Sequence, residues 1–322
     1  MNPITFFTSV QDQLQFVEGR IREQAGDEHH PDLRSALEHL LSAGGKRIRP
    51  TLGLLVGNML GAPEENLITL GAAVELLHTA TLVHDDLIDG ALLRRGMPTL
   101  NARWSPAATV LTGDFLFARA AKLAAETNYL PLMRLFAETL GTIVNGELTQ
   151  MFSARGTIER DNYYNRIYAK TASLFEMAAL AAAMVATEAE DMRASMKTFG
   201  YEVGMAFQIV DDILDFTGEP SAVGKPIGSD LLNGLVTLPT LYYAEANPNN
   251  EDILSLPHGG WKDTARVQRL VDIICRSEAI EQSMEEARQA VRRALKCLDD
   301  APISPERDAL ENLAKFIVGR KS

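Results

Sequence analysis

The sequence is short of cysteine and of basic charge, and each shortage excludes a class of protein. Only two cysteines, Cys275 and Cys297, occur in 322 residues. They lack the paired spacing of zinc or redox motifs, so we expect reduced thiols in a cytoplasmic protein. Lys and Arg number 31 against 43 Asp and Glu, a net charge of −12. Nucleic-acid binding is therefore not expected.

The chain also lacks long apolar runs and alternating strand patterns. No run reaches the ~18 apolar residues of a membrane span, and residues 1–20 contain no basic segment followed by a long apolar stretch. Neither a transmembrane helix nor a signal peptide is expected. Val and Ile never alternate with polar residues for long, so no strand is predicted.

What the sequence does contain is helical periodicity, with apolar residues recurring at intervals of three and four. Proline and glycine punctuate these segments, and no linker divides the chain. We predict an all-α fold, a single-domain antiparallel helical bundle over residues 1–322 around a deep central cavity. The predicted helical segments are Leu67–Leu93, Leu111–Leu123, Leu132–Met151, Tyr163–Val185, Met196–Phe216 and Ile280–Leu298.

Two aspartate clusters of the same D-D-x-x-D spacing lie inside apolar segments. The first comprises Asp85, Asp86 and Asp89, and the second comprises Asp211, Asp212 and Asp215. On a helix, positions i and i+4 share a face, so each cluster presents carboxylates to one side. Like charges at this spacing are unfavourable unless a cation offsets them. Carboxylates are hard oxygen ligands, which favours Mg²⁺ shared with a substrate phosphate.

Cationic residues accompany the clusters. The segment Gly44–Pro50 (GGKRIRP) places three cations after a flexible glycine pair, as an oxyanion site would require. Arg94 and Arg95 follow Asp89 closely, and His78 lies two helical turns before Asp85. Weaker polar candidates near or within apolar segments are Lys170, Thr171, Gln208 and Lys225.

Together these features indicate one class of substrate. Two carboxylate clusters imply a set of metal ions, and the separate cationic groups imply more than one phosphorylated end. Apolar helices around a cavity imply a greasy body attached to those phosphates. Isoprenoid diphosphates meet all three requirements.

The motifs resemble those of the trans-isoprenyl diphosphate synthases, the polyprenyl synthetases, and in particular their long-chain type. The similarity runs through GGKRIRP, LLHTATLVHDDLIDGALLRRG, the Lys-Thr at 170–171, FQIVDDILDFTG and GKPIGSDL…TLP, and covers roughly residues 20–320. The motifs are independent of one another and occur in the family's order.

The resemblance implies a role for each matching residue. The six aspartates would hold about three Mg²⁺ ions on an allylic diphosphate, farnesyl or geranylgeranyl diphosphate. The same diphosphate would contact Arg94, Lys170, Thr171, Gln208 and Lys225. The metal-free partner, isopentenyl diphosphate, would be held by Lys46, Arg49, His78 and Arg95. The six aspartates, Arg94 and Lys170 would be the catalytic residues.

The resemblance also implies a mechanism. Metals and cations would stabilise the departing diphosphate, and the allylic cation would be attacked by isopentenyl diphosphate. The segment Gly218–Asp230 is a candidate lid that excludes water. One position departs from the pattern: Leu235 stands where many members have a lysine, which removes one expected diphosphate contact.

Product length should depend on Ala80 and Thr81, the fifth and fourth residues before Asp85. Short-chain enzymes of this family carry a bulky aromatic residue there. A helical turn rises ~5.4 Å, so small residues leave room for further isoprene units, and we expect a product of roughly C30–C50 for quinone side chains. The alternative is a shorter-chain (C15–C20) synthase. Candidates for the cavity floor are Phe115, Phe117, Ile143, Val144 and Phe152.

Two other functions share parts of this pattern. A terpene cyclase or head-to-head synthase has the aspartate clusters but no need of a second diphosphate site. A non-catalytic subunit of a heteromeric synthase usually loses aspartates, and all six are present here. The resemblance further implies a homodimer, and we expect at most transient membrane contact, since no basic amphipathic anchor is found.

Overall fold

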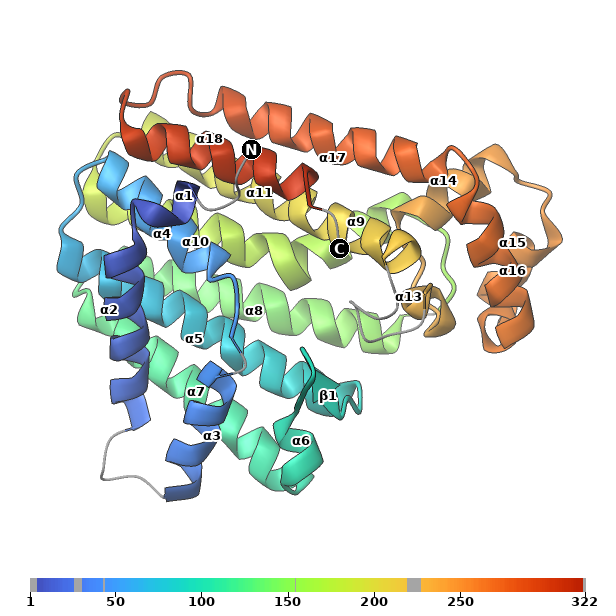
Figure 1. Ribbon diagram of the computed structural model, residues 1–322, viewed down its shortest axis with the longest axis horizontal. Coiled ribbons are helices and arrows are strands. Elements are labelled where there is room, and N and C mark those ends of the chain that lie inside the picture. Colours follow the sequence, from blue (N-terminus) through green and yellow to red (C-terminus); the bar gives the residue numbers. More distant parts are fainter. Residues whose placement is uncertain (1–4, 26–30, 43, 154, 219–226, 321–322) are drawn as a thin grey trace. The chain divides into compact units, whose positions relative to one another are not determined.

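The computed structural model describes residues 5–25, 31–42, 44–153, 155–218 and 227–320, and these residues are almost entirely helical (Figure 1). The expected all-α class is confirmed. The chain forms two compact units, and the helices α8 (Leu130–Phe152), α11 (Glu190–Thr217) and α18 (Pro305–Val318) each contribute to both. A single domain over 1–322 with a deep central cavity stays a prediction.

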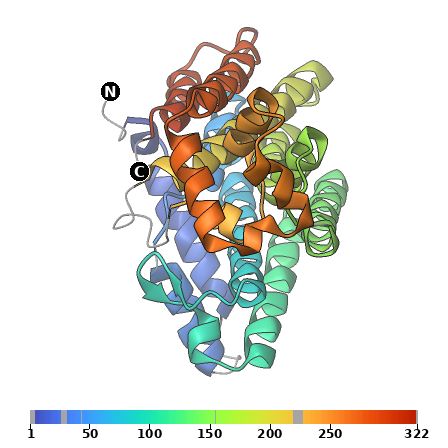
Figure 2. The same cartoon turned by 90° about the vertical axis from the view of Figure 1, so that its right-hand side faces the viewer.

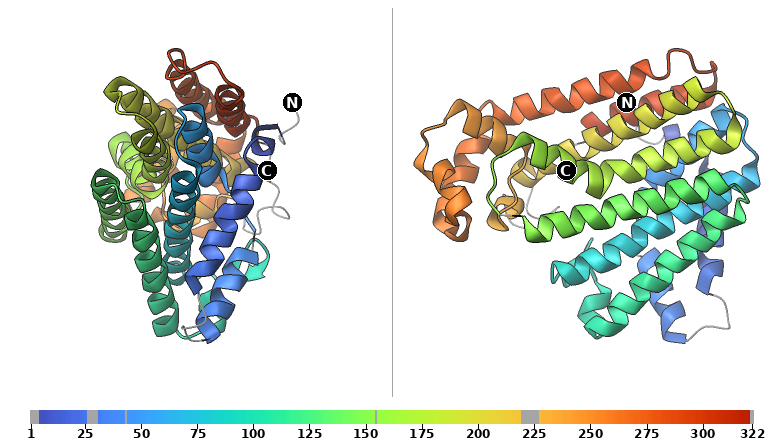
Figure 3. Two further views of the ribbon diagram at one scale, coloured as in Figure 1. Left: turned by 90° about the vertical axis from the view of Figure 1, so that its left-hand side faces the viewer. Right: turned by 180° about the vertical axis from the view of Figure 1, so that it is seen from behind.

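The first unit comprises Met1–Thr139, Leu174–Gly200 and Asp300–Asn312. Its central helix is α5, Glu64–Ile88, on which α2, α4 and α7 pack (Figure 3). Glu64 and Glu65 occupy the first turn of α5, where carboxylates complement the helix dipole. Other elements of this unit are α1 (Thr5–Thr8), α2 (Gln11–Arg22), η1 (Glu23–Ala25), α3 (Pro31–Ser42), α4 (Ile48–Met59), α6 (Leu100–Arg103), α7 (Pro106–Glu126) and most of α10 (Ser173–Ala186).

A glycine allows α7 to approach α5 next to the first aspartate cluster. A Cβ atom on Gly113 would lie 2.3 Å from Nε2 of His84, far inside van der Waals contact. His84 also packs against Phe117, with ring centroids 5.1 Å apart. The residue that precedes Asp85 is thus fixed by close helix packing, which limits the freedom of the cluster itself.

The structure corrects the sequence prediction just beyond α5. The periodic pattern suggested a helix as far as Leu93, whereas α5 ends at Ile88 and a short hairpin follows, β1 (Leu93–Arg94) paired with β2 (Met97–Pro98). Its two-residue turn, Arg95-Gly96, has φ of 53° and 75°. Positive φ at both turn residues suits the right-handed twist of a tight hairpin.

The second unit comprises Leu140–Ser173, Tyr201–Asp299 and Leu313–Ser322. In it α9 (Arg160–Ile167) continues into a π-helical segment, η2 (Tyr168–Ala172), and such segments often occur at functional sites. The short elements α15 and η4 pack on α16, and η3 packs on both of these short elements (Figure 2). The remaining bounds are α13 (Ser229–Leu232), α14 (Leu238–Ala246), α15 (Glu251–Ser255), η3 (Leu256–His258), η4 (Gly260–Lys262), α16 (Thr264–Cys275) and α17 (Ala279–Lys296).

Two helical stretches, Glu64–Ile88 and Arg160–Ala186, are long and apolar enough to cross a membrane by length and composition alone. In both, 67% of the apolar window is buried inside the protein. Core helices of globular proteins have this character, so the two stretches are weak evidence for a membrane span.

Candidate active site

The two aspartate clusters occupy equivalent places on their helices. Asp85 and Asp86 lie in the last turn of α5, Asp89 is its C-cap, and the second cluster lies in the final turns of α11. In both clusters the middle aspartate is buried, while the flanking aspartates are at least partly exposed. The carboxyl end of a helix carries a partial negative charge, which adds to that of the carboxylates. Both sites therefore favour cations.

Asp86, the buried member of the first cluster, is held by Arg94. Nε and Nη2 of Arg94 lie 2.9 and 2.8 Å from the same carboxylate oxygen, Oδ1. Asp86 is 6% exposed, so an unpaired charge here would be strongly unfavourable. In this structure the guanidinium predicted to contact diphosphate anchors the cluster.

The hairpin turn brings Arg95 to the glycine pair that precedes α4. Arg95 Nη1 donates a hydrogen bond to the carbonyl of Gly44, whose φ is 68°. A Cβ atom on Gly45 would lie 2.9 Å from Arg95 Nη1, so the second glycine makes room for the guanidinium. Burial and the neighbouring Arg94 lower the pKa of Arg95. Two guanidinium groups, those of Arg94 and Arg95, next to glycines that have no side chain suit an anionic ligand.

His78 lies near four arginines of the first unit, Arg47, Arg49, Arg94 and Arg95. Its Nε2 is 3.1 Å from Nη1 of Arg49, and the Arg49 guanidinium stacks 4.6 Å above the ring of Phe175. Burial, and after it the guanidinium groups of Arg49 and Arg95, lowers the pKa of His78 well below its usual value. The imidazole is therefore neutral at physiological pH and offers one donor and one acceptor.

Arg47 has a structural role that the sequence did not reveal. It begins α4 with a φ of 46°, its Nη1 lies 2.7 Å from Oε1 of Glu75, and its Nε lies 3.3 Å from Glu18. Glu75 is 5% exposed, so this is a buried ion pair. Lys46 beside it is exposed. Of the three cations in GGKRIRP, Arg47 fixes the segment through its ion pair with Glu75, and Lys46 and Arg49 lie on either side of Arg47 in the sequence.

The residues expected to control product length differ in their surroundings. Ala80 is fully buried, whereas Thr81 is half-buried and donates to the carbonyl of His78 at 2.7 Å. Among the floor candidates, Ile143 is buried, but Val144 and Phe152 are exposed, Phe152 by 84%. Phe115 lines an apolar cavity of about 570 Å³ together with residues of α3 and the start of α7.

In the second cluster, Asp212 is buried and has both carboxylate oxygens engaged. The Tyr163 hydroxyl donates to Oδ2 and the Gln208 amide donates to Oδ1, each at 2.8 Å. The oxygen of that amide accepts from Thr171 at 2.6 Å. Burial, and after it the charge of Asp230, raises the pKa of Asp212 to about 8. Thr171 and Gln208, predicted to contact substrate, position Asp212 in this structure.

The two flanking aspartates of the second cluster have different partners. Asp215 accepts from the Ser229 hydroxyl at 2.7 Å and from the backbone N–H of Asp230 at 3.1 Å. Asp211 forms an ion pair of 2.9 Å with Arg320. Neither Arg320 nor Tyr163 was singled out from the sequence, because no local spacing relates either residue to an aspartate in α11.

Lys170 and Thr171 both lie in the π-helical segment, η2. The Lys170 ammonium lies 2.9 Å from Oε1 of Glu147 on α8. A Cβ atom on Gly146 would lie 2.4 Å from that of Ala169, so α8 approaches η2 closely at this point. The extra residue of a π turn re-aims the side chains, and here it directs Thr171 toward Gln208.

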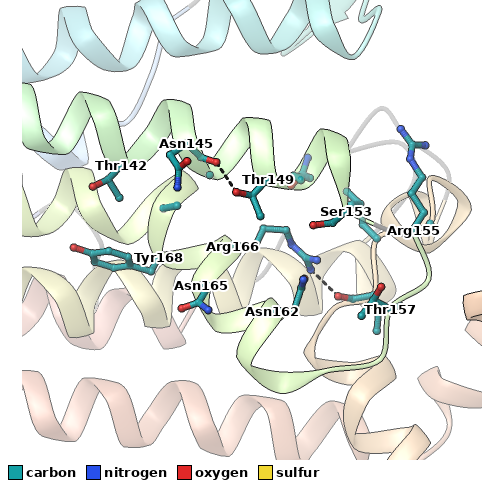
Figure 4. Close-up of a pocket in the computed structure, with 16 residues that line it drawn as sticks. Thr142, Asn145, Thr149, Ser153, Arg155, Thr157, Asn162, Asn165, Arg166 and Tyr168 are labelled. Atoms are coloured by element: carbon teal, nitrogen blue, oxygen red, sulfur yellow. Dashed lines mark hydrogen bonds between the residues drawn. The ribbon is translucent and has the colours of Figure 1, made fainter.

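Leu235, the position at which the family lysine is replaced, lines a polar cavity of about 390 Å³ between α8, α9 and the segment 234–236 (Figure 4). Arg166 donates to the Val236 carbonyl at 2.6 Å, and Arg155 donates to that of Asn233 at 3.0 Å. Among the described residues that line this cavity, none has an acidic side chain. The cations beside the segment therefore come from α9 and from the loop after α8.

Part of the predicted site lies outside the described residues. Lys225 and most of the candidate lid fall within residues 219–226, which the structure does not describe. The role of Lys225 and the lid therefore stay predictions. Of the lid's described end, Gly228 donates its backbone N–H to the carbonyl of Asp215 at 2.8 Å.

The donor set suits Mg²⁺ in a particular way. In the part of the chain that the structure describes, no three His, Cys, Asp or Glu side chains are grouped to enclose a metal ion. Mg²⁺ usually binds through one or two carboxylates and completes its octahedron with water and substrate phosphate. The partly exposed pairs Asp85/Asp89 and Asp211/Asp215 match this requirement, and a guanidinium already lies against Asp211.

Comparison with known proteins identifies relatives over nearly the whole chain. The polyprenyl synthetase family model matches residues 30–274. A heptaprenyl diphosphate synthase component 2 of Geobacillus stearothermophilus is 38% identical over 312 residues, 97% of each chain. An all-trans-nonaprenyl-diphosphate synthase of Rhodobacter capsulatus, described as geranyl-diphosphate specific, is 39% identical over 294 residues, 89% of this chain and 88% of that one.

Solved structures give the same result. A polyprenyl synthase of Caulobacter crescentus, complexed with calcium and isoprenyl diphosphate, matches with a TM-score of 0.92 and 33% identity, over 100% of this chain and 98% of that one. A decaprenyl diphosphate synthase of Rhodobacter capsulatus matches with a TM-score of 0.89 and 32% identity, over 98% of each chain.

Proposed function

The chain belongs to the polyprenyl synthetase family, as a trans-prenyltransferase of the long-chain type, and from this premise we propose its substrates, metal and product. It condenses isopentenyl diphosphate head to tail with an allylic diphosphate, farnesyl or geranylgeranyl diphosphate. The reaction depends on Mg²⁺. The product is a long all-trans polyprenyl diphosphate that supplies quinone side chains.

One observation carries the proposal: within the first unit, a guanidinium cluster and a partly exposed aspartate pair lie along the same helix. Arg49 and Arg95 lie beside His78 of α5, and Asp85 and Asp89 lie about two and three turns further along. The arginines suit a diphosphate that brings no metal, and the aspartates suit one that does. A terpene cyclase would have no use for the first of these sites.

The residues divide the reaction between them. Lys46, Arg49 and Arg95 hold isopentenyl diphosphate, and neutral His78 adds a hydrogen bond without adding charge. Arg94, which anchors Asp86, and Lys170, which pairs with Glu147, supply positive charge to the allylic diphosphate as its C1–O bond breaks and the electron pair leaves with the diphosphate, and Thr171 acts through Gln208 on Asp212. The double bond of isopentenyl diphosphate then forms the new bond to C1. The departing diphosphate accepts the proton that is released, so no side chain acts as the base.

Mg²⁺, about three ions in all, would be held by Asp85 and Asp89 in the first unit and by Asp211 and Asp215 in the second, and would neutralise charge that develops on the leaving diphosphate. Asp86 and Asp212 complete the six aspartates of the motif. Their buried side chains orient the neighbouring carboxylates, Asp86 through Arg94 and Asp212 through Tyr163 and Gln208. The calcium in the Caulobacter crescentus relative is also a hard divalent cation with oxygen ligands.

Product length follows from the small side chains before the first cluster. Thr81 retains accessible surface and leaves the space that a bulky aromatic side chain would fill. The names of the relatives, from heptaprenyl to nonaprenyl and decaprenyl synthases, support a product of roughly C30–C50.

Label incorporation tests the proposal. Purified protein is incubated with farnesyl diphosphate, labelled isopentenyl diphosphate and Mg²⁺, with and without EDTA. We expect metal-dependent incorporation, reduced at least 100-fold in Asp85→Asn and Asp211→Asn, because each removes a charged ligand. Asp191→Asn is the matched control, an exposed aspartate in the first turn of α11, and should retain activity. Unused isopentenyl diphosphate would favour the cyclase instead.

The assembly is proposed to be a homodimer in the cytoplasm, with at most transient membrane contact as the product is released. Two relatives are described as component 2 of a heptaprenyl diphosphate synthase, which raises the alternative of a second component. Light scattering of the purified chain, together with its activity alone, decides between them. A dimer that is active alone supports the proposal, and an inactive chain that regains activity with an added cell extract supports the alternative.

A further inference from the structure

Arg320 places a cation on the second aspartate cluster. It lies two residues beyond the end of α18, and its Nη1 is 2.9 Å from Oδ1 of Asp211. Its guanidinium also lies 4.5 Å above the ring of Phe207, one helical turn before Asp211 on α11. The Arg320 side chain is 15% exposed. All three residues belong to the second unit, so the contact lies within one compact body.

The cluster needs a cation even when no metal is bound. Asp211 and Asp215 share a face at the carboxyl end of α11, and Asp230 lies beside them, with its backbone N–H 3.1 Å from Oδ2 of Asp215. Repulsion between these carboxylates, added to the helix dipole, destabilises the folded chain unless positive charge offsets it. Lys170 is paired with Glu147, and among the described residues Arg320 lies as a cation on Asp211.

The geometry of the contact suits a temporary partner. Nη1 of Arg320 is buried but makes no well-directed hydrogen bond, so the interaction is mainly electrostatic. By contrast, Arg293 grips Glu202 in the same unit with two hydrogen bonds of 2.7 and 2.8 Å. A guanidinium held to a carboxylate by two hydrogen bonds is harder for a metal ion to displace than one held by a single, poorly directed ion pair. The ring of Phe207 would retain the guanidinium after Asp211 is released.

We propose that Arg320 is a tethered counter-ion that occupies Asp211 until a divalent cation replaces it, and that it thereby weakens the affinity of the second cluster for metal. The inference rests on the proposed function, since it assumes that the second cluster binds metal. It has two consequences of opposite sign. Without Arg320 the metal-free protein is less stable, yet the metal binds more tightly because no cation has to leave.

Binding of Mn²⁺, measured by calorimetry on full-length EDTA-treated protein, tests this. Every protein in the experiment carries Asp85→Asn and Asp89→Asn, so that only Mn²⁺ binding at the second cluster is measured. The protein with these two changes alone is the parent. Arg320→Met keeps the apolar stem and removes the charge, and we expect about 2- to 10-fold tighter binding than in the parent. Arg320→Lys keeps the charge and should bind as the parent does. Arg292→Met, which removes an exposed pair with Glu285 in the same unit, is the control.

Thermal unfolding supplies the second readout. In EDTA the midpoint of Arg320→Met should lie below that of Arg292→Met, and saturating Mn²⁺ should narrow the difference. Unchanged or weaker Mn²⁺ binding in Arg320→Met would overturn the inference while leaving the proposed function intact. If neither the parent nor any variant binds Mn²⁺, the inference fails, whereas the proposed function is decided separately by Mg²⁺-dependent incorporation in the protein that keeps Asp85 and Asp89.

Discussion

The buried ion pair between Arg47 and Glu75 predicts a specific pattern of stability. Nη1 of Arg47 is 2.7 Å from Glu75, and the two side chains are 12% and 7% exposed. Replacing Arg47 by Met leaves Glu75 buried without its partner, which typically costs about 3–5 kcal/mol. A chain of 322 residues has an unfolding entropy that converts this loss into a fall in Tm of roughly 4–7 °C.

A double variant shows whether the loss of stability arises from the unpaired charge of Glu75 or from other contacts of Arg47. A buried ion pair replaced by apolar side chains of similar volume is often neutral in stability, so Arg47→Met with Glu75→Met should recover most of the loss. Arg22→Met is the control, because its pair with Glu18 is partly exposed and should contribute less than about 1 kcal/mol. The assay is thermal and urea unfolding followed by circular dichroism.

Two results would refute the reasoning about Arg47. One is a single variant that unfolds within about 1 °C of the parent, which would mean that the pair does not hold the segment before α4. The other is a double variant no more stable than the single one, since a second loss would show that each side chain acts separately. If the pair does position Lys46 and Arg49, the single variant also raises KM for isopentenyl diphosphate more than it changes kcat.

Four further predictions follow from the site. The pKa of His78 is lowered in the folded protein, so on acidification the unfolded chain binds the His78 proton first. The free energy of unfolding therefore falls as the pH drops below about 6.5, by at most ~1.4 kcal/mol per pH unit. His78→Asn should reduce this dependence on pH, as measured by urea unfolding at pH 5 and pH 7. Tyr163→Phe removes the hydroxyl from Asp212 and should lower kcat/KM about 10-fold, whereas an unchanged value would deny the hydrogen bond a role. Leu235→Lys should lower KM for farnesyl diphosphate about 3- to 10-fold in initial-rate assays, and no change would show that the site needs no further cation. Thr81→Phe should shift the sized products toward roughly C15–C20, and an unchanged product length would place the determinant elsewhere.

Helical periodicity predicted most of the fold because it is a local property. The segments Leu132–Met151 and Tyr163–Val185 correspond to α8 and to α9 with its continuation, each within three residues at either end. The prediction ran too far by five residues at Leu93, where a hairpin follows α5, and by two residues at Leu298, beyond the end of α17. The hairpin depends on the positive φ of Arg95 and Gly96, and the spacing of apolar residues carries no information about backbone φ.

The candidate site was predictable where residues lie close in sequence and hidden where they do not. The i, i+4 rule predicted that each cluster presents carboxylates to one side, and the structure adds that Asp85 and Asp89 are at least partly exposed while Asp86 between them is buried. No such rule relates Tyr163 to Asp212 or Arg320 to Asp211, because those contacts depend on how distant helices pack.

The central claim, a long-chain prenyl diphosphate synthase, is tested most directly by the size of its product. Purified protein is given farnesyl diphosphate, excess labelled isopentenyl diphosphate and Mg²⁺, and the dephosphorylated products are separated by chain length. We expect a metal-dependent ladder that ends within roughly C30–C50, as the proposed role of the small Thr81 side chain requires. A ladder that stops at C15–C20, or no elongation with or without a second component, would contradict it.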